Sequence, residues 1–197
     1  LEEEDLSSEI RENLEAVSQA SIRARDLVKQ ILAFAHQTED AAIPISPATI
    51  VKETLKLMRA SLSPAIEISS RLVSKSIVMG VPTHIQQIVM NLFSNAAHAM
   101  KDKGGMLTVE LLDVLLEQSF LIPYPGRVPG YYLKLTVQDT GCGIPSDIVD
   151  YIFQPYFTTK SSEEGTGLGL ALVHGLVNAC GGFVDFTTEL GKGTKFD

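Results

Sequence analysis

Residues 139–170, DTGCGIPSDIVDYIFQPYFTTKSSEEGTGLGL, decide the fold of this chain. Asp139 closes an apolar strand pattern and is followed by a glycine turn. A short aromatic segment, a polar gap and a second glycine cluster (residues 165–169) come next, and an apolar helix pattern follows. A glycine-rich turn that leads into a helix exposes backbone amides at the positive end of the helix dipole, which favours phosphate. The order of these features predicts a nucleotide pocket in which a carboxylate reads the base and a helix N-terminus holds the phosphates.

The composition is that of a globular protein. The chain has 197 residues, of which 45% are hydrophobic and 20% charged, so extensive disorder is excluded. The net charge of −8 argues against a nucleic-acid surface. Cys142 and Cys180 have neither zinc-ligand spacing nor a disulfide framework, and we expect both to be reduced in a cytoplasmic setting. No apolar run approaches the ~20 residues of a membrane span.

The sequence predicts two parts, with a boundary near residue 41. Residues 8–36 carry apolar side chains at alternating spacings of three and four, which predicts a long helix with a coiled-coil seam. Pro44 and Pro47 indicate a linker over residues 37–47. The helix either lies on its own domain or forms one arm of a helical hairpin in a dimeric bundle. We favour the second alternative because no Gly or Pro interrupts the seam, and we expect the chain to be part of a longer protein.

Residues 41–197 alternate between strand and helix patterns, which predicts an α/β domain. A Pro- and Gly-rich segment near its middle, residues 117–130, is expected to be a surface hairpin tip without a catalytic part. Pro64 is expected to end the helix that begins at Pro47. Three helices are predicted in this domain: one that begins at Pro47, one over about residues 82–101 and one over 168–179. Strands are predicted over residues 66–73, 76–79, 107–116, 131–138, 183–187 and the residues after the Gly191–Gly193 turn.

The common phosphate-binding motifs are missing. Gly191 and Lys192 are followed by Gly193, so there is no GxxxxGK[ST] loop, and residues 165–169 (GTGLG) are not GxGxxG. The sequence has no HRD or DFG motif of a eukaryotic protein kinase and no histidine pair with metal-ligand spacing. A nucleotide pocket therefore requires another fold.

Four segments in order resemble the nucleotide-binding boxes of histidine kinases. The resemblance covers about residues 80–182 and implies the Bergerat fold, an α/β sandwich with helices on one face of a mixed sheet. The helix over residues 20–37 also resembles the second helix of that family's dimerisation and phosphotransfer domain. The family would therefore divide the chain into a partial helical hairpin (1–40) and an ATP-binding catalytic domain (41–197). The four segments are residues 91–96 (NLFSNA, the N box), 139–144 (DTGCGI, the first glycine box), 153–160 (FQPYFTTK, the F box) and 165–170 (GTGLGL, the second glycine box).

The resemblance assigns a base acceptor and a metal ligand. Asp139 would accept a hydrogen bond from the adenine amino group, which selects adenine over guanine; its alternative role is to cap a turn. Asn95 would offer its side-chain carbonyl oxygen to Mg²⁺, which prefers oxygen ligands, and Asn91, one turn earlier, would support the ion or its waters. Gly141 and Gly143 would let the backbone turn tightly against the base, with Cys142 as a small buried filler between them.

The phosphate contacts fall on the F box and the second glycine box. Lys160 would reach the terminal phosphate as a point charge; its alternative is a solvated loop lysine. Residues 161–164 would form a short polar lid, and Phe153 and Phe157 would pack beneath it. The phosphates of ATP would meet the segment formed by Gly165, Thr166, Gly167, Leu168 and Gly169.

The same fold serves both ATP hydrolysis and phosphoryl transfer. The hydrolases place a glutamate one turn before the metal-binding asparagine to activate water, whereas this chain has Asn91 there, so transfer to a docked histidine is favoured. The resemblance implies an acceptor on a helix absent from this chain, relay to a response-regulator aspartate, and a homodimeric parent; it leaves open whether the parent is membrane-anchored. A nucleotide-dependent regulatory module and an ATPase without kinase activity stay open as alternatives. No histidine here has the acidic neighbour of a phosphoacceptor; the four are His36, His84, His98 and His174.

Overall fold

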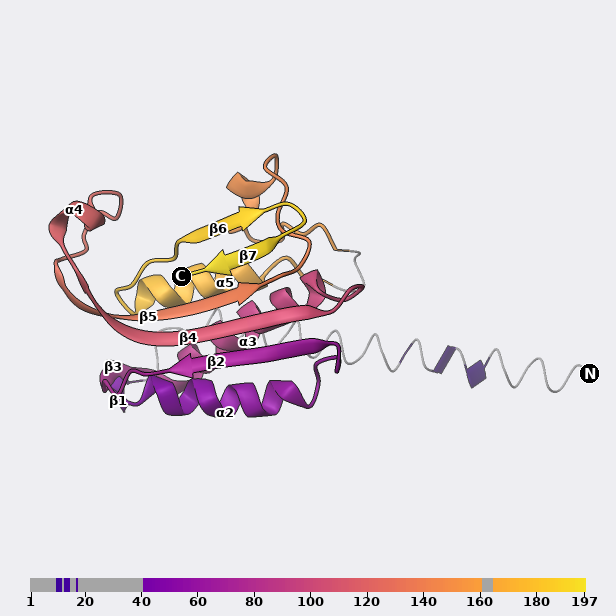
Figure 1. The fold of residues 1–197 in the computed structure, drawn as a ribbon, viewed down its shortest axis with the longest axis horizontal. Coiled ribbons are helices and arrows are strands. Elements are labelled where there is room, and N and C mark those ends of the chain that lie inside the picture. The colour runs from indigo at the N-terminus through magenta and orange to yellow at the C-terminus, as the bar shows by residue number, and fades with distance from the viewer. Residues whose placement is uncertain (1–9, 12, 15–16, 18–40, 161–164) are drawn as a thin grey trace, which may run out of the picture. The chain divides into compact units, whose positions relative to one another are not determined.

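The computed structural model describes residues 10–11, 13–14, 17, 41–160 and 165–197 (Figure 1). The chain divides into two compact units, Leu1–Asp40 and Ala41–Asp197. In the first unit the described residues are helical, and Ile10, Leu14 and Val17 are exposed. The rest of the helix predicted over 8–36 lies outside the described residues, so its role in a helical hairpin stays a prediction.

The second unit is built on a mixed five-stranded sheet in the order β2-β4-β5-β7-β6. Strand β2 (Ile66–Leu72) runs parallel to β4 (Gly105–Leu116). The other neighbours are antiparallel: β4 with β5 (Gly130–Asp139), β5 with β7 (Gly193–Phe196), and β7 with β6 (Phe186–Glu189). The fold class expected from the sequence is therefore confirmed.

Three helices cover one face of this sheet (Figure 1). Helix α3 (Pro82–Ala99) contacts both α2 (Pro47–Arg59) and α5 (Gly169–Ala179). Both α2 and α3 begin with proline at their first position, where a missing N–H leaves no intrahelical bond unmade. Helix α2 ends at Arg59, five residues before the proline expected to stop it. Within the described part of the chain, no helix combines the length and the apolar character needed to cross a membrane.

The core lies between the sheet and α3. Alternate residues of β4 point inward and are buried, as the period of two along a strand requires. The buried stripe of α3 packs on them, and Phe93 at its centre is fully buried. The core also receives side chains from β5 and α5; its most buried members include Val89, Phe93, Leu107, Val109, Leu111, Val137, Val173 and Leu176.

The predicted linker over residues 37–47 is wrong in part, because residues Ile43–Ile45 form strand β1. Strand β1 pairs antiparallel with β3 (Val78–Gly80), with Pro44 opposite Met79. A two-stranded sheet leaves each strand one open edge, so the missing N–H of Pro44 is tolerated there. The strand expected from residue 183 begins only at residue 186.

The segment between β4 and β5 packs on the rest of the unit, and does more than turn the chain. It contains a short helix, α4 (Gln118–Leu121). The ring of Tyr124 stacks on Phe183 at 3.9 Å between centroids, so the segment packs against the residues that precede β6. Arg127 Nη2 donates a hydrogen bond to Asn178 Oδ1 at 2.9 Å, so the hairpin reaches the C-terminal end of α5.

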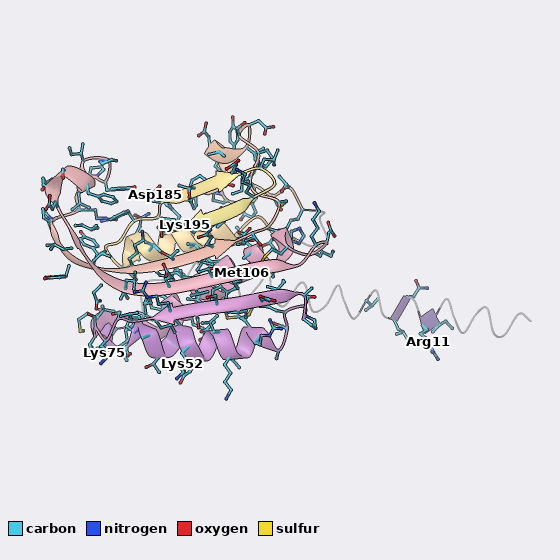
Figure 2. The ribbon with its side chains drawn as sticks, in the orientation of Figure 1. Arg11, Lys52, Lys75, Met106, Asp185 and Lys195 are labelled. Carbon is cyan, nitrogen blue, oxygen red and sulfur yellow. The ribbon has the colours of Figure 1, made fainter. Side chains whose placement is uncertain are left out.

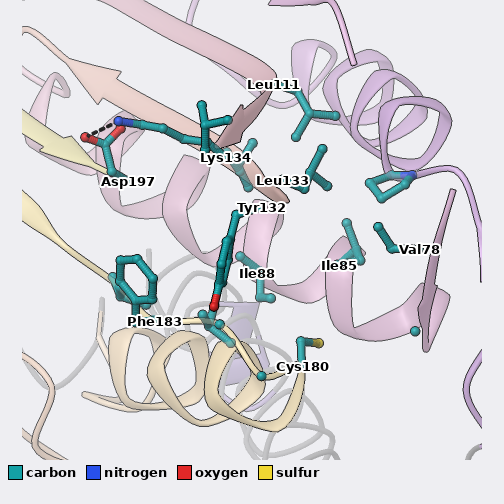
Figure 3. A pocket seen from close by; sticks show the side chains of 18 of the residues that line it. Val78, Ile85, Ile88, Leu111, Tyr132, Leu133, Lys134, Cys180, Phe183 and Asp197 are labelled. Atoms are coloured by element: carbon teal, nitrogen blue, oxygen red, sulfur yellow. Dashed lines mark ion pairs between the residues drawn. The ribbon is translucent and has the colours of Figure 1, made fainter. Parts of the chain in front are cut away.

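A cavity of about 630 Å³ lies between the sheet and the helices (Figure 3). Its lining is mostly apolar, with Ile85 and Ile88 from α3 and Leu133 from β5. The charged pair at its margin, Lys134 Nζ and Asp197 Oδ2, is joined at 3.1 Å. None of the residues expected to bind a nucleotide lines this cavity.

Candidate nucleotide site

The N-terminus of α5 lies against the two asparagines of α3. Gly169 is the first residue of α5, and a Cβ added to it would lie 3.0 Å from Asn91 Oδ1 and 3.8 Å from Asn95 Nδ2. Asn91 Nδ2 donates to the Gln87 carbonyl at 2.8 Å, so the other side of its amide, the carbonyl oxygen, meets Gly169. The structure thus joins the first and last of the four boxes in three dimensions.

Lys160 also reaches this place. Its Nζ donates a hydrogen bond to Asn95 Oδ1 at 3.1 Å, across 65 positions of sequence. The stem of Lys160 packs on Gly165, where an added Cβ would lie 2.9 Å from the lysine Cβ. The interpretation of Lys160 as a solvated loop residue is wrong for this conformation, because its side chain is held in the site.

The Asn95 side-chain oxygen therefore already binds a cationic group, the Lys160 ammonium. The described residues contain no group of three or more His, Cys, Asp or Glu that could hold a metal ion. A divalent ion here would need the amide oxygen together with phosphate and water oxygens, which is the donor set Mg²⁺ prefers. The residues present fit such an ion.

The aromatic segment and the second glycine box are fastened to each other. Tyr156 N donates to the Gly167 carbonyl at 2.9 Å, and both residues have left-handed backbones, with φ of 69° and 67°. A side chain at Gly167 would collide with the Tyr156 backbone, so only glycine fits this close approach. Leu168 N donates to Thr166 Oγ1 at 3.4 Å immediately before α5.

Phe153 packs as expected, with its ring 5.4 Å from the ring of His174 and 5.8 Å from that of Phe186. Phe157 contacts Tyr151 at 5.8 Å. The polar lid expected at residues 161–164 lies outside the described residues. Phe153 therefore anchors the aromatic segment on both α5 and the sheet, a few residues before Lys160.

Asp139 ends β5 and is only 5% exposed. Its Oδ1 accepts hydrogen bonds from Gly141 N at 2.8 Å and Thr194 N at 3.3 Å. Burial raises the pKa of this carboxyl above the ordinary aspartate value, and the backbone hydrogen bonds oppose that rise without cancelling it. The side chain does cap the following turn, as its alternative role required, but a turn cap alone does not explain a buried charge.

The glycines of the first box are explained by chain packing. A Cβ on Gly141 would lie 2.6 Å from the carbonyl oxygen of Ala99, the last residue of α3, and Gly143, at φ 71°, would collide with the Glu189 carbonyl. Cys142 N donates to the same Ala99 oxygen at 3.1 Å. The expectation of Cys142 as a buried filler is wrong, because this residue is exposed.

Sequence reasoning missed two threonines beside Asp139. Thr194 lies on β7, is 5% exposed and binds Asp139 through its amide. Its hydroxyl lies 3.0 Å from that of Thr188, which accepts a hydrogen bond from Ile144 N at 2.8 Å. The turn before Thr194 was visible in the sequence, but the β5–β7 pairing that brings it to Asp139 was not.

The class of protein follows from this arrangement: a mixed sheet covered by helices, with a buried aspartate at a strand end and a helix N-terminus beside two amides, defines a nucleotide-binding α/β domain. The family model described as histidine kinase-, DNA gyrase B-, and HSP90-like ATPase matches residues 80–197. The chain belongs to this family.

Proteins similar in sequence are named as sensor kinases. The chain is 33% identical to the sensor kinase CckA of Brucella abortus, over 91% of this chain and 19% of that protein. It is 31% identical to the sensor histidine kinase ZraS of Escherichia coli K12, over 88% of this chain and 34% of that protein. The chain thus spans between a fifth and about a third of the length of these relatives.

Solved structures agree with the fold. Full-length ShkA in complex with AMPPNP matches with a TM-score of 0.71 and 26% identity, covering 94% of this chain and 37% of that one. The mycobacterial sensor histidine kinase MprB matches with a TM-score of 0.59 and 26% identity, covering 79% and 93%.

Proposed function

We propose that this chain is the ATP-binding kinase part of a two-component sensor histidine kinase, which transfers the γ-phosphoryl group of ATP to a histidine outside the chain. The observation that carries the proposal is the meeting of Asn91, Asn95, Lys160 and Gly169 at the N-terminus of α5. Family membership and the names of the relatives support it.

In this proposal each residue has one task. The Asp139 carboxylate accepts a hydrogen bond from the adenine amino group, held in place by the amides of Gly141 and Thr194. Asn95 Oδ1 is a ligand of Mg²⁺, and Asn91 orients the ion's waters. Mg²⁺, when bound, neutralises charge on the phosphates. The phosphates meet Lys160 and the backbone of the second glycine box, from Gly165 through Thr166, Gly167 and Leu168 to Gly169, at the positive end of α5.

Phosphoryl transfer is favoured over hydrolysis because, among the residues that the structure describes, the position one turn before Asn95 offers no base for water. Asn91 stands one turn before Asn95, and its Nδ2 is already engaged with the Gln87 carbonyl. A neutral amide does not abstract a proton from water at neutral pH. The remaining tasks are positioning and charge stabilisation, which are the protein's main contributions to phosphoryl transfer.

The acceptor and the partners belong to the same proposal. His84, His98 and His174 lie in helices of the second unit, none beside an acidic residue, and His36 lies outside the described residues. The acceptor histidine would precede this chain on the first helix of a hairpin, with residues 1–40 supplying part of the second helix and dimerisation occurring through that hairpin. A receiver domain of a response regulator would take the phosphoryl group, in the cytoplasm.

The test uses a version of the protein that begins upstream of an acceptor helix. After incubation with γ-labelled ATP and Mg²⁺, we expect retained label that acid removes and base spares, as for phosphohistidine. The variant Asn95→Ala should lose both the label and the Mg²⁺-dependent part of nucleotide affinity while keeping its fold. Nucleotide binding without any label would instead favour a regulatory module, and steady phosphate release without label would favour an ATPase.

A further inference from the structure

Two cations, the Lys160 ammonium and the proposed Mg²⁺, would bind the same oxygen atom, Asn95 Oδ1. Asn95 Oδ1 accepts a hydrogen bond from the Lys160 ammonium at 3.1 Å. The same oxygen is the protein ligand that the proposed function gives to Mg²⁺. A divalent ion bound to this oxygen would lie within a few ångströms of the ammonium, and two cations at that separation repel strongly in a partly buried site.

Lys160 is held in this position by its stem as well as by its charge. Its Cβ and Cδ each lie 2.9 Å from the place where a side chain would begin on Gly165. Glycine at residue 165 therefore leaves room for the lysine stem to cross it. The backbone of Lys160 is fixed too, since its N donates to Thr158 Oγ1 at 3.1 Å. The contact with Asn95 thus has local support from both Gly165 and Thr158.

We propose that the Lys160 ammonium occupies the metal position of the nucleotide-free protein, so that Lys160 and a divalent cation exclude each other at Asn95 Oδ1. The phosphates of a bound nucleotide attract the ammonium away from Asn95 and release the oxygen for the metal. Lys160 is in this sense a positioning residue, which couples metal binding to nucleotide binding. The inference rests on the proposed function, because it takes the Asn95 oxygen as the metal ligand.

Two consequences separate this role from a simple phosphate contact. The nucleotide-free protein should bind a divalent cation poorly at Asn95, although the oxygen is correctly placed. Removing the ammonium while keeping an apolar stem should then create an Asn95-dependent metal site in the absence of nucleotide. A lysine that only binds phosphate would leave metal binding to the free protein unchanged when it is removed.

The experiment measures Mn²⁺ binding to the nucleotide-free chain, by electron paramagnetic resonance of the free ion and by paramagnetic broadening of the Asn95 side-chain amide in NMR spectra. Lys160→Met should bind Mn²⁺ at least about tenfold more tightly than the unchanged protein, a size typical of coupling between two sites. The double variant Lys160→Met with Asn95→Ala should lose this gain. Lys160→Arg, which keeps the cation, should bind Mn²⁺ as weakly as the unchanged protein.

Lys52→Met is the control for net charge. Lys52 is exposed on α2 (Figure 2), a helix that contributes no residue to the proposed nucleotide site, so its variant should behave like the unchanged protein. Broadening of the Asn95 amide in the unchanged protein as strong as in Lys160→Met, or no gain in Lys160→Met, would overturn the inference.

Calorimetry of ADP with Mn²⁺ on the unchanged protein tests the proposed function separately from the exclusion at Asn95. Absence of nucleotide binding there would remove the proposed function itself. Asn95-dependent binding of ADP and Mn²⁺, together with no gain in Lys160→Met, would leave the proposed function standing and remove only the exclusion at Asn95.

Discussion

Asp139 shows how a single residue can weaken the fold while enabling binding. Its carboxylate is nearly inaccessible to solvent, and it accepts hydrogen bonds from two backbone amides, those of Gly141 and Thr194. Burial raises its pKa, so the folded protein holds the proton more firmly than the unfolded chain does. Keeping this charge buried makes sense where a ligand supplies the missing donor, as the amino group of adenine would.

We predict that Asp139→Asn separates these two effects. Asparagine can still accept from Gly141 N and Thr194 N, so at neutral pH the free energy of unfolding should be unchanged or higher. Nucleotide affinity should fall roughly ten- to hundred-fold, because a hydrogen bond to a charged group contributes ~1.5–3 kcal/mol. Thermal denaturation and calorimetry with ADP would measure the two quantities on the same protein.

The pH dependence has opposite signs for folding and for binding. Because the folded pKa of Asp139 is raised, the contribution of this carboxyl to stability is greatest below its unfolded pKa and is lost as pH rises through the folded pKa. Nucleotide binding needs the ionised acceptor, so affinity should fall as pH drops through the raised pKa, at a higher pH than for an ordinary aspartate. Equal pH profiles for the unchanged protein and Asp139→Asn would contradict the assignment of the base acceptor.

Gly169 allows a second prediction at the residue scale. Alanine at this position suits a helix better than glycine, so the stability of Gly169→Ala should be equal or higher by up to about 1 kcal/mol. Its methyl group would press on Asn91 Oδ1, which an added Cβ approaches to 3.0 Å. We expect nucleotide affinity to fall about tenfold, or ~1.4 kcal/mol.

A double-mutant cycle tests whether the effect passes through Asn91. If it does, Gly169→Ala should have little further effect on affinity in an Asn91→Ala background, because the two changes act on one contact. Additive losses in the double variant would show that the alanine disturbs the phosphate-binding amides of α5 directly.

At the scale of elements, α3 organises the site along one stripe. Asn91, Asn95 and Ala99 are spaced four residues apart and so lie on one face of the helix. They contact three different segments in turn: Gly169 at the start of α5, Lys160 at the end of the F box, and the first glycine box through the Ala99 carbonyl. The opposite stripe of α3, with Phe93 at its centre, is in the core. Packing of the core therefore sets the relative positions of all four boxes.

Gly167 gives a prediction at this scale, with Gly191 as its matched control. Both have left-handed backbones, at φ 67° and 80°. Gly191 has no atom within 4 Å of an added Cβ, whereas Gly167 would collide with the Tyr156 backbone. Gly191→Ala should cost about 1–2 kcal/mol for its backbone conformation alone, and Gly167→Ala a further ~1–3 kcal/mol for overpacking.

Chemical denaturation of the two variants would measure this difference. The loss in Gly167→Ala should be accompanied by weaker nucleotide binding, since the Tyr156–Gly167 contact fastens the second glycine box. Equal stability of the two variants would mean that the close approach at Tyr156 is relaxed at little cost.

The sequence predicted the long elements well because their apolar periods match the fold. The stripe of α3 and the alternation of β4 correspond closely to buried faces in the structure. Short elements were missed where tertiary contacts decide them. Strand β1 contains a proline and exists by pairing with β3, and Phe183, expected in a strand, instead lies before β6 and stacks on Tyr124 from a distant segment.

The residues of the site also fall into those that the sequence predicted and those that it did not. Asp139, Asn91 and Asn95 could be found because their motifs have fixed local spacing. Thr194 and the Lys160–Asn95 contact could not, because each depends on a pairing across more than 50 residues. Even the reason for Gly141 and Gly143 lay in such contacts, with the end of α3 and with the end of β6.

For the whole molecule, the question is how far the second unit is independent of the first. All residues of the proposed nucleotide site lie in Ala41–Asp197, which also contains the described core. The described residues of the first unit include Ile10, Leu14 and Val17, exposed at helical spacing. Exposed apolar residues in such a row favour association with another helix. Nucleotide binding should therefore belong to the second unit, and self-association to the first.

We predict that a chain of residues 41–197 alone folds and binds ADP with Mg²⁺ as tightly as the full 197-residue chain. It should also sediment as a monomer at concentrations where the longer chain begins to associate, because the apolar row has been removed. Calorimetry and sedimentation velocity on the two chains measure these properties, with a chain carrying Ile10→Gln and Val17→Gln as the control that removes the row and keeps the length. A loss of nucleotide affinity in the shorter chain, with its fold intact, would show that residues 1–40 contribute to the site, and self-association unchanged by either alteration would place the contact on the second unit.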